Sequence, residues 1–320
     1  MLYGAGCATP LSTFSHASDA AERTATLSWL MVAVSTAIFI LVCVVMVAAI
    51  ARGKGSERGI VGLEERGRGW LLWGGLVLPV VVLSLVSVIA VRVMRQRIPA
   101  ENAVTILVTG HQWWWQLDYD LGSAQTRFRT ANELHVPVGR PVLLKLTTSD
   151  VIHSFWVPSL AGKMDLLPGD TNELRVEARR AGTFTGACAE YCGAQHAHMA
   201  ITVVAEDSAS FARWVTAEAA PSVSSLDSTA AAGQQLFTKG VCATCHTVRG
   251  TDARGPVGPD LTHVGSRLTI AAGSLTNSFG AIEGWIADPQ AIKPGAAMPT
   301  LNAYSGPELR ALAAYVANLR

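Results

Sequence analysis

Two short stretches of the chain concentrate side chains that bind metals or cofactors. The stretch "CAEYCGAQHAHM", from Cys188 to Met199, holds two cysteines, two histidines and a methionine. A disulfide would use only the two sulfurs. The second stretch, "CATCH", from Cys242 to His246, holds two further cysteines followed directly by a histidine. Both stretches therefore predict metal or cofactor chemistry.

The donor set of the first stretch favours copper. Thiolate and imidazole suit zinc or copper, and a weak thioether ligand shifts the preference to copper. Cys188 and Cys192 are followed by His196 and Met199 at short spacing, and "SDVIHSFWVPSL" adds His153 upstream. A site that holds a single copper ion with thiolate, imidazole and thioether ligands needs only one cysteine. Two bridging thiolates, one imidazole for each ion, the methionine and a backbone carbonyl would complete two copper ions, and His198 is left over as a surface or supporting residue.

The second stretch is the attachment signature of a c-type haem. Its two thiols bond the vinyl groups and the adjacent His246 reaches the iron. Bare CxxC pairs are commonly redox dithiols or half of a zinc site, but the trailing histidine favours haem. Met298 in "GAAMPTL" is the expected sixth ligand because it is the only methionine after the motif, with His263 as its rival. A His/Met pair fills both axial positions and makes the haem an electron carrier.

Two apolar runs precede these sites. The chain has 320 residues, of which 50% are hydrophobic and 15% charged. The runs Leu27 to Ala51 and Trp70 to Val91 contain no charged residue and exceed the roughly 20 residues that span a bilayer. They predict two transmembrane helices; the alternative is a helical hairpin buried in a large core. The loop between them is rich in Arg and Lys, which favours a cytoplasmic loop. Haem attachment, made outside the cytoplasm, places the rest of the chain there.

The chain after the second run changes character twice. Short alternating and β-branched segments divided by Gly and Pro predict a small antiparallel β-sandwich or barrel. The small, polar stretch from Ala219 to Gly233 has the composition of a linker, and helical patterns follow it. The net charge is +1 and no basic patch appears, so no nucleic-acid partner is expected. The expected parts are an N-terminal segment 1–26, a transmembrane hairpin 27–97, a β domain 98–218, a linker 219–228 and a helical domain 229–320.

Together these motifs resemble subunit II of cytochrome c oxidase fused to a class I cytochrome c, as in the caa3-type bacterial oxidases. The resemblance is carried by "DVIHSFWVPSLAGKMDLLPG", "CAEYCGAQHAHM", "GHQWWW", "CATCH" and "GPVGPDL". It implies a multidomain membrane protein with a two-helix transmembrane hairpin. An all-β cupredoxin-like sandwich would hold the binuclear copper centre CuA, and an all-α class I cytochrome c domain would follow.

The resemblance also implies individual ligands. For CuA these are one backbone carbonyl and five side chains: Glu190, His153, Cys188, Cys192, His196 and Met199. The Glu190 carboxylate would help to bind magnesium at the interface with subunit I. Asp165 matches an acid near that site, although a turn-capping aspartate would look the same. Haem c would be held covalently and axially by Cys242, Cys245, His246 and Met298.

The first tryptophan of the aromatic run, Trp113, would receive the incoming electron. A role in the membrane interface or the core is the alternative, and is credible for its two neighbours. Similar subunits carry an acid near the start of the second span that feeds a proton channel. Glu64 and Glu65 lie too early for that role, and Glu101 lies past the span. Cys7 lacks the apolar segment that precedes a lipid-modified cysteine.

The implied function is electron input to a bacterial terminal oxidase. Electrons from a cytochrome c or a quinol-oxidising complex would pass through haem c and CuA to the haem-copper centre of subunit I, which reduces oxygen with proton translocation. Neither span contains His, Asp or Glu, so no catalytic residue is expected here and a partner must supply the oxygen site. Other oxidase subunits and membrane lipid complete the expected partners, at the bacterial plasma membrane with periplasmic soluble domains. The alternatives are the CuA subunit of a haem-copper nitric oxide reductase and a membrane-tethered electron carrier or copper-delivery protein.

Overall fold

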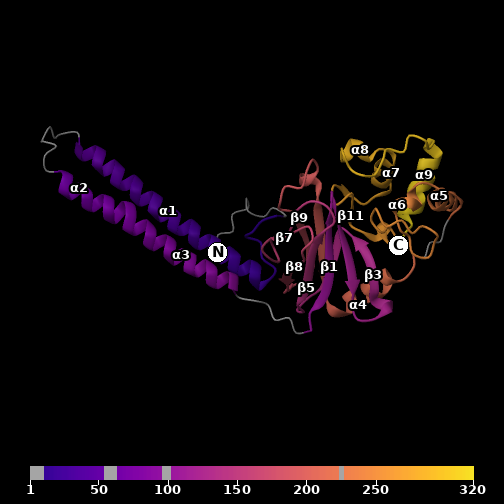
Figure 1. Ribbon diagram of the computed structural model, residues 1–320, viewed down its shortest axis with the longest axis horizontal. Coiled ribbons are helices and arrows are strands. Elements are labelled where there is room, and N and C mark those ends of the chain that lie inside the picture. Colours follow the sequence, from indigo (N-terminus) through magenta and orange to yellow (C-terminus); the bar gives the residue numbers. More distant parts are fainter. Residues whose placement is uncertain (1–10, 54–62, 96–101, 223–226) are drawn as a thin grey trace. The chain divides into compact units, whose positions relative to one another are not determined.

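The computed structural model describes residues 11–53, 63–95, 102–222 and 227–320 (Figure 1). The chain divides into two compact units, one of residues Glu22–Arg97 and one of Met1–Ala21 with Ile98–Arg320. Cys7 and Glu101 lie outside the described residues, as do the side chains of Glu64 and Glu65.

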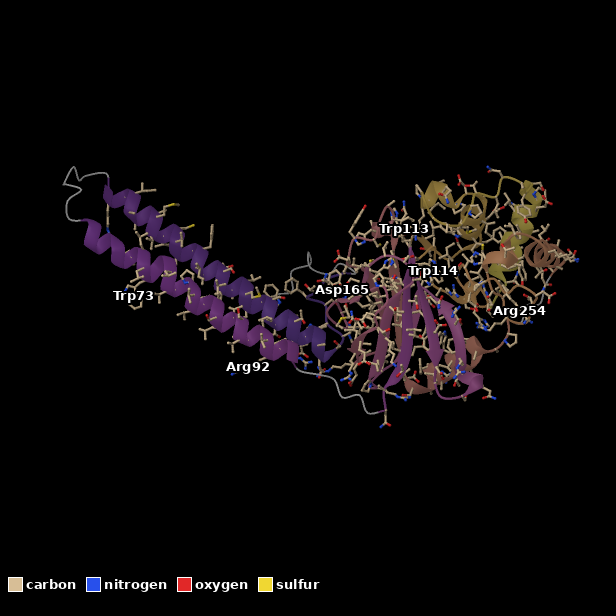
Figure 2. All side chains as sticks on the ribbon, viewed as in Figure 1. Trp73, Arg92, Trp113, Trp114, Asp165 and Arg254 are labelled. Atoms are coloured by element: carbon tan, nitrogen blue, oxygen red, sulfur yellow. The ribbon has the colours of Figure 1, made fainter. Side chains whose placement is uncertain are left out.

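The smaller unit consists of apolar helices. Its elements are α1 (Asp19–Gly53), α2 (Leu63–Leu72), a π-helical turn (Trp73–Val77) and α3 (Leu78–Arg95). Two stretches, Asp19–Gly53 and Gly69–Val93, are long and apolar enough to cross a membrane, and none of the most apolar window of either is buried. Figure 2 shows Trp73 projecting from the second of them. The two predicted apolar helices are therefore confirmed.

A proline explains the irregular turn in the second apolar helix. Pro79 follows the π-helical turn and lacks the N–H that would bond the carbonyl of Gly75. Its ring also crowds that carbonyl, so the turn widens locally. The helix continues because a membrane helix tolerates this local adjustment.

Ten strands of the larger unit form the β-sandwich (Figure 1). One sheet has the order β3-β2-β1-β5-β8, made of Arg127–Ala131, Trp114–Asp120, Val104–His111, Val142–Thr148 and Asn172–Val176. The other has the order β4-β10-β9-β6-β7, made of Glu133–Pro137, Ala200–Glu206, Gly182–Cys188, His153–Trp156 and Met164–Leu166. Helix α4 (Ser208–Ala219) follows β10.

Alternation of side chains builds the core of this sandwich. Along β1 every second residue is buried, and Ile106 and Val108 are fully enclosed together with Leu144 and Leu146 of β5. The sheets are not purely antiparallel as predicted, since β1 pairs with β5 and β4 with β10 in parallel. Those partners are not consecutive along the chain, so no short hairpin has to join them.

The helical domain packs around its first and last helices. Its helices are α5 (Ser228–Lys239), α6 (Cys242–Cys245), α7 (Phe279–Ala287), α8 (Pro289–Ile292) and α9 (Gly306–Ala317), with a ribbon of β11 (Thr269–Ile270) and β12 (Leu275–Thr276). A Cβ at Gly233 of α5 would lie 1.9 Å from the Ala311 carbonyl oxygen, so glycine is needed where α5 crosses α9. Phe237 and Tyr315 meet edge to face beside this crossing, with ring centroids 5.4 Å apart. This framework carries the cysteine–histidine motif at α6.

Candidate functional site

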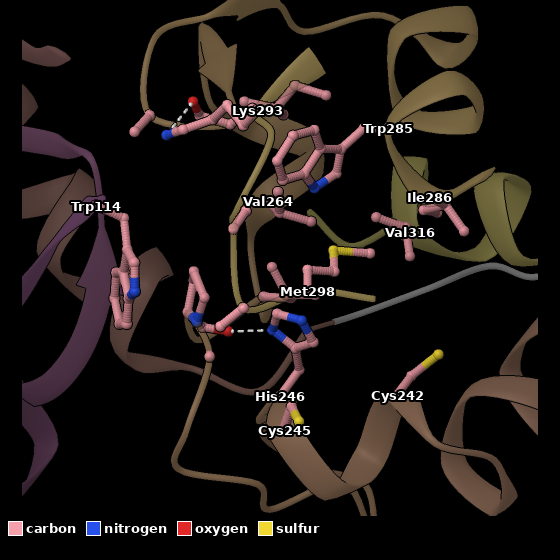
Figure 3. Close-up of a pocket in the computed structure, with 18 of the residues that line it drawn as sticks. Trp114, Cys242, Cys245, His246, Val264, Trp285, Ile286, Lys293, Met298 and Val316 are labelled. Atoms are coloured by element: carbon pink, nitrogen blue, oxygen red, sulfur yellow. Dashed lines mark hydrogen bonds between the residues drawn. The ribbon is translucent and has the colours of Figure 1, made fainter. Parts of the chain in front are cut away.

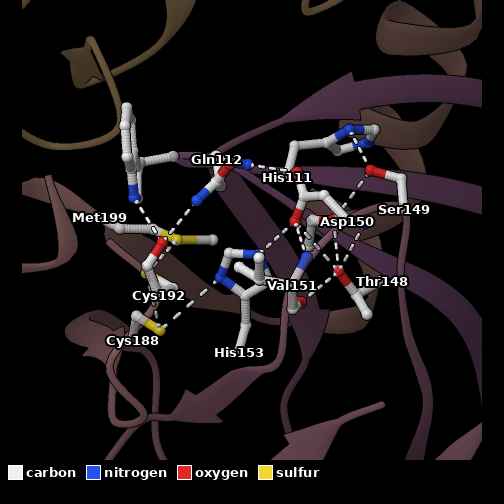
Figure 4. A network of polar contacts seen from close by, with 12 residues as sticks. His111, Gln112, Thr148, Ser149, Asp150, Val151, His153, Cys188, Cys192 and Met199 are labelled. Carbon is white, nitrogen blue, oxygen red and sulfur yellow. Dashed lines mark hydrogen bonds and ion pairs between the residues drawn. The ribbon is translucent and has the colours of Figure 1, made fainter. Parts of the chain in front are cut away.

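The sulfur and imidazole donors of the β-sandwich converge at one end of β6 and β9 (Figure 4). The Sγ atoms of Cys188 and Cys192 lie 3.8 Å apart and both cysteines are free thiols. His153 Nδ1 lies 3.9 Å from Cys188 Sγ, and His196 Nδ1 lies 3.6 Å from Cys192 Sγ. Met199 Sδ lies 3.9 Å from Cys192 Sγ. Soft sulfur and imidazole donors at these separations fit copper ions held between them.

Backbone geometry adds one oxygen to this donor set. The carbonyl oxygen of Glu190 lies 3.2 Å from Cys188 Sγ. His198 is exposed, and its Nδ1 bonds the Gln195 side chain at 2.7 Å, away from the two sulfurs. The structure thus brings together the six donors predicted from the sequence and leaves His198 outside them.

The two thiols affect each other's ionisation: when one loses its proton, the other keeps its own and donates a hydrogen bond to the thiolate. The hydrogen bond from Cys192 lowers the pKa of the Cys188 thiol, and the same bond raises the pKa of Cys192. Two thiolates this close repel each other unless a proton or a cation lies between them. Copper ions held by the two sulfurs would supply that positive charge.

Asp150 orients the histidine at the edge of this cluster. Its Oδ1 accepts from His153 Nε2 at 2.8 Å, so Nδ1 is left to face the sulfurs. Burial acts to lower the pKa of His153, but the Cys188 sulfur and the Asp150 carboxylate outweigh it and the pKa is raised. Asp150 also accepts from the backbone N–H of Gln112 at 2.7 Å. The carboxylate therefore ties the ligand strand to the loop before Trp113.

A glycine leaves room for the same histidine. A Cβ at Gly110 would lie 2.7 Å from His153 Cδ2 and 3.3 Å from a methyl carbon of Leu166. His153 is fully buried, so its ring has no free direction in which to move. Gly110 is thus required by close approach.

The aromatic run divides into three different environments. Trp113 is 8% exposed, and its Nε1 donates to the Cys192 carbonyl at 2.9 Å. Trp114 stacks on His111, with ring centroids 4.2 Å apart. Trp115 is fully buried between the sheets, where it meets Phe155 edge to face. Of the three, Trp113 is the one bonded to a metal-ligand loop.

Two carboxylates lie at the surface beyond the copper-binding loop. Lys163 Nζ lies 3.8 Å from Asp165 Oδ1 and 3.8 Å from Glu190 Oε2. Both acids are nearly half exposed, so they are available to a cation or to another protein surface. Glu190 therefore presents its carbonyl inward and its carboxylate outward.

The helical domain encloses an apolar cavity (Figure 3). The side chains of Cys242, Cys245, His246 and Met298 line it, and all four are labelled in Figure 3. Both cysteines are free thiols. Apolar residues make up most of the remaining wall, among them Val264, Ile282, Trp285, Ile286, Leu312 and Val316. An apolar slot with two thiols and two axial donors fits a covalently attached haem.

Local hydrogen bonding sets the orientation of His246. Its Nδ1 bonds the carbonyl oxygen of Pro259 at 2.8 Å. Because a carbonyl only accepts, Nδ1 carries the proton and Nε2 remains free for a metal. Burial lowers the pKa of His246, which favours the neutral form that binds iron. His263, the alternative axial ligand, instead donates from Nε2 to the Ala220 carbonyl at 3.0 Å. It is not among the described residues that line this cavity.

Three supporting residues were not singled out from the sequence. They are Asp150, Gln112 and Lys293, the last of which donates from Nζ to the Trp113 carbonyl at 2.8 Å. Asp150 had a usable signal, because it lies three residues before His153 and a metal-binding histidine is commonly oriented by a nearby carboxylate. Lys293 had none, since it follows Trp113 by 180 residues in another domain.

The chain matches known families in both soluble domains. Residues 104–206 match the family described as cytochrome c oxidase subunit II, periplasmic domain, and residues 230–320 match cytochrome c. Cytochrome c oxidase subunit 2 of Alkalihalophilus pseudofirmus is 40% identical over 69% of this chain, which spans 62% of that relative's length. The subunit 2 of Bacillus subtilis is 31% identical over 98% of this chain and 94% of its own length. The subunit 2 of Bacillus sp. strain PS3 is 30% identical over 84% of this chain and 79% of its own length.

The chain combines donors for a pair of metal ions, donors for a haem and two apolar helices. This combination defines a membrane-anchored electron-transfer protein. The match to the Bacillus subtilis protein extends over nearly the whole of both chains. The chain belongs to the cytochrome c oxidase subunit 2 family, in the form that carries a C-terminal cytochrome c domain. Copper and haem c are its cofactors.

Replacing Gly110 by alanine should weaken copper binding. The added methyl group would lie 2.7 Å from the His153 ring and displace it, and we expect the copper affinity to fall about tenfold or more. Chelator competition followed by copper absorbance measures this affinity. Gly162→Ala is the matched control, because Gly162 is exposed with no heavy atom within 4 Å of the added carbon. Equal copper affinity in both variants would contradict the prediction.

Proposed function

We propose that this chain is the electron-input subunit of a bacterial terminal oxidase. Electrons from a donor would pass through haem c to CuA and on to the haem-copper centre of subunit I, which reduces oxygen to water with proton translocation. The observation that carries the proposal is the pair of unlinked sulfurs, 3.8 Å apart, with an imidazole beside each. A protein that delivers a single copper ion would not require both sulfurs with an imidazole beside each.

In this proposal the ligands of CuA are Glu190 through its carbonyl and the side chains of His153, Cys188, Cys192, His196 and Met199. The two thiolates would hold a pair of copper ions close enough to share one electron, with little change of geometry when the electron is transferred. The protein's part is to keep the donors in place: Asp150 holds the His153 ring, and Gln112 and Trp113 both donate to the Cys192 carbonyl, at 2.8 and 2.9 Å. Rigid donors lower the reorganisation that each electron transfer demands.

For haem c the proposed attachments are Cys242 and Cys245, with His246 and Met298 as axial ligands. The bond from His246 to the Pro259 carbonyl fixes the imidazole, and Gly258 allows the loop to pass close to it, since a Cβ there would lie 2.7 Å from His246 Cε1. A haem with both axial positions filled has no open coordination site. The domain is thereby suited to carry electrons.

The partners follow from what the chain lacks. The two apolar runs contain no His, Asp or Glu, so the oxygen-reducing site and the proton path are assigned to subunit I and other oxidase subunits. The exposed carboxylate of Glu190, with Asp165 nearby, is the proposed magnesium site at the subunit I interface. A cytochrome c or a quinol-oxidising complex is the donor. We place the protein in the lipid of the bacterial plasma membrane, with both soluble domains on the periplasmic side.

The names of the relatives favour an oxidase over the two alternatives. The three relatives described above are all cytochrome c oxidase subunits. Gas uptake by the purified complex, with oxygen compared with nitric oxide, tests the choice of acceptor. A stand-alone carrier or a copper-delivery protein would purify without a haem-copper partner, and that result would overturn the proposal.

Cys192→Ser should abolish the binuclear copper centre while the c-type haem remains. A serine oxygen does not bridge two soft ions as a thiolate does. We expect loss of the mixed-valence copper signal in electron paramagnetic resonance, with an unchanged haem difference spectrum. An unchanged copper signal would show that the ligand assignment is wrong.

Met298→Ala should lower the reduction potential of the haem and slow its reduction by the donor. Loss of a thioether ligand removes preferential stabilisation of the reduced iron. Redox titration of the haem band measures the potential. His263→Ala is the control, because His263 bonds a backbone carbonyl away from the haem cavity. A lowered potential in His263→Ala with none in Met298→Ala would reverse the axial assignment.

A further inference from the structure

One lysine of the haem domain is inserted between the two redox sites. Lys293 is 3% exposed, and its Nζ donates to the carbonyl oxygens of Trp113 and His198 at 2.8 Å each and of Ala271 at 3.3 Å. The first two carbonyls belong to the β-sandwich. Within the described residues no carboxylate pairs with this ammonium group.

The residues after Lys293 extend the same contact. Gln195 Nε2 donates to the Pro294 carbonyl at 2.9 Å, from the loop that carries His196. Gly295 has a φ of +87°, and a Cβ there would lie 3.6 Å from the Trp113 indole. Three consecutive residues of the haem domain therefore touch the copper-binding end of the sandwich.

This segment leads directly to the haem cavity. Met298 lies three residues after Gly295, and it lines that cavity together with Lys293 (Figure 3). Gln112 and Trp113 of the copper domain also line it. On its other side Trp113 donates to the carbonyl of Cys192. The indole is thus a shared wall, in contact with the haem cavity and hydrogen-bonded to a thiolate loop of the copper site.

Burying an ammonium group is costly unless its donors are satisfied in place. Burial lowers the pKa of Lys293 to about 8, so the group has lost much of its hydration. Three carbonyl oxygens replace that water as acceptors. Two of them belong to the copper domain, so they can accept from Lys293 only while the two domains keep their relative placement. A buried polar group of this kind specifies one arrangement where apolar packing would tolerate several.

Other contacts also join the domains, one of them beside Lys293, where Ala200 N donates to the Ala272 carbonyl at 3.0 Å. Leu268 N donates to Glu133 Oε2 at 2.7 Å, and Arg249 Nη1 donates to the Arg129 carbonyl at 3.0 Å. These two bonds attach the haem domain to β3 and β4. They can keep the domains associated when Lys293 is replaced, while the segment at Trp113 shifts.

We propose that Lys293 is a positioning residue that holds the Met298 segment against Trp113 and thereby sets the rate of electron transfer from haem c to CuA. The inference rests on the proposed function and adds to it a specific control point within the chain. Electron transfer between fixed centres depends on their placement, so a small shift of this segment slows it.

The test uses the full chain, loaded with copper and haem, and the variant Lys293→Met. A flash-activated ruthenium reductant delivers an electron to the haem, and the absorbance of haem and copper follows its transfer. We expect the rate to fall severalfold, because the rate of electron tunnelling decreases exponentially as the distance between the two centres grows. Both absolute spectra should stay unchanged. The haem potential, which the loss of a buried positive charge lowers, is measured in each variant so that the change in driving force is separated from the change in placement.

A second measurement does not depend on the cofactors. Hydrogen–deuterium exchange of the peptides that contain Trp113 and Gly295 should rise in Lys293→Met, in both the loaded and the metal-free chain. Lys293→Gln retains an amide donor and should give an intermediate rate. Lys239→Met is the matched control, because it removes the same charge from an exposed position in the same domain.

The outcomes separate this inference from the function it rests on. An electron-transfer rate in Lys293→Met equal to that of the unsubstituted chain would overturn the inference alone, whether or not exchange rises. Equal slowing in Lys239→Met would also overturn it, since charge and not position would then be the cause. A lack of binuclear copper or covalent haem in the unsubstituted chain would overturn the proposed function as well.

Discussion

Two sulfur atoms held 3.8 Å apart without a bond between them impose the main constraint on the copper domain. Both are shielded from water, and their charges can coexist only with a proton or a cation between them. The surrounding structure meets that demand with fixed donors. His153 begins β6, Cys188 ends β9, and the pairing of Phe155 with Cys188 brings the two strand ends together.

The haem domain solves a different problem, since a large apolar group must be enclosed by a small helical fold. Its cavity is lined mostly by aliphatic and aromatic side chains, with His246 and Lys293 among the polar residues of the wall. The backbone carbonyl of Pro259 fixes the histidine, and three carbonyls fix the lysine. Because Trp113 belongs to the wall of the same cavity, the copper domain completes the haem site from outside.

The apolar helices have a different role from the two soluble domains. Their most hydrophobic windows are unburied within the chain, and such surfaces require lipid or a partner of the same character. The two soluble domains hold the donors for copper and haem. This chain is thus equipped to receive and relay electrons for another subunit.

The sequence alone determined the features that arise from neighbouring residues. Cys188, Cys192, His196 and Met199 lie between the last residue of β9 and the first residue of β10, and the haem motif lies within one helical turn and the residue that follows it. Apolar length predicted the membrane helices for the same reason, since a helix closes its hydrogen bonds locally. Alternation predicted the β-sandwich but not the parallel pairing of β1 with β5, because pairing joins distant segments.

Only the tertiary structure decided which groups support the metal donors. Gly110 clears space for His153 across 43 residues, Asp150 connects that histidine to the loop before Trp113, and Lys293 reaches Trp113 across 180 residues. Of these contacts, only the one between Asp150 and His153 is local in the sequence. The others depend on how two sheets and a second domain pack, and packing is a property of the whole chain in three dimensions.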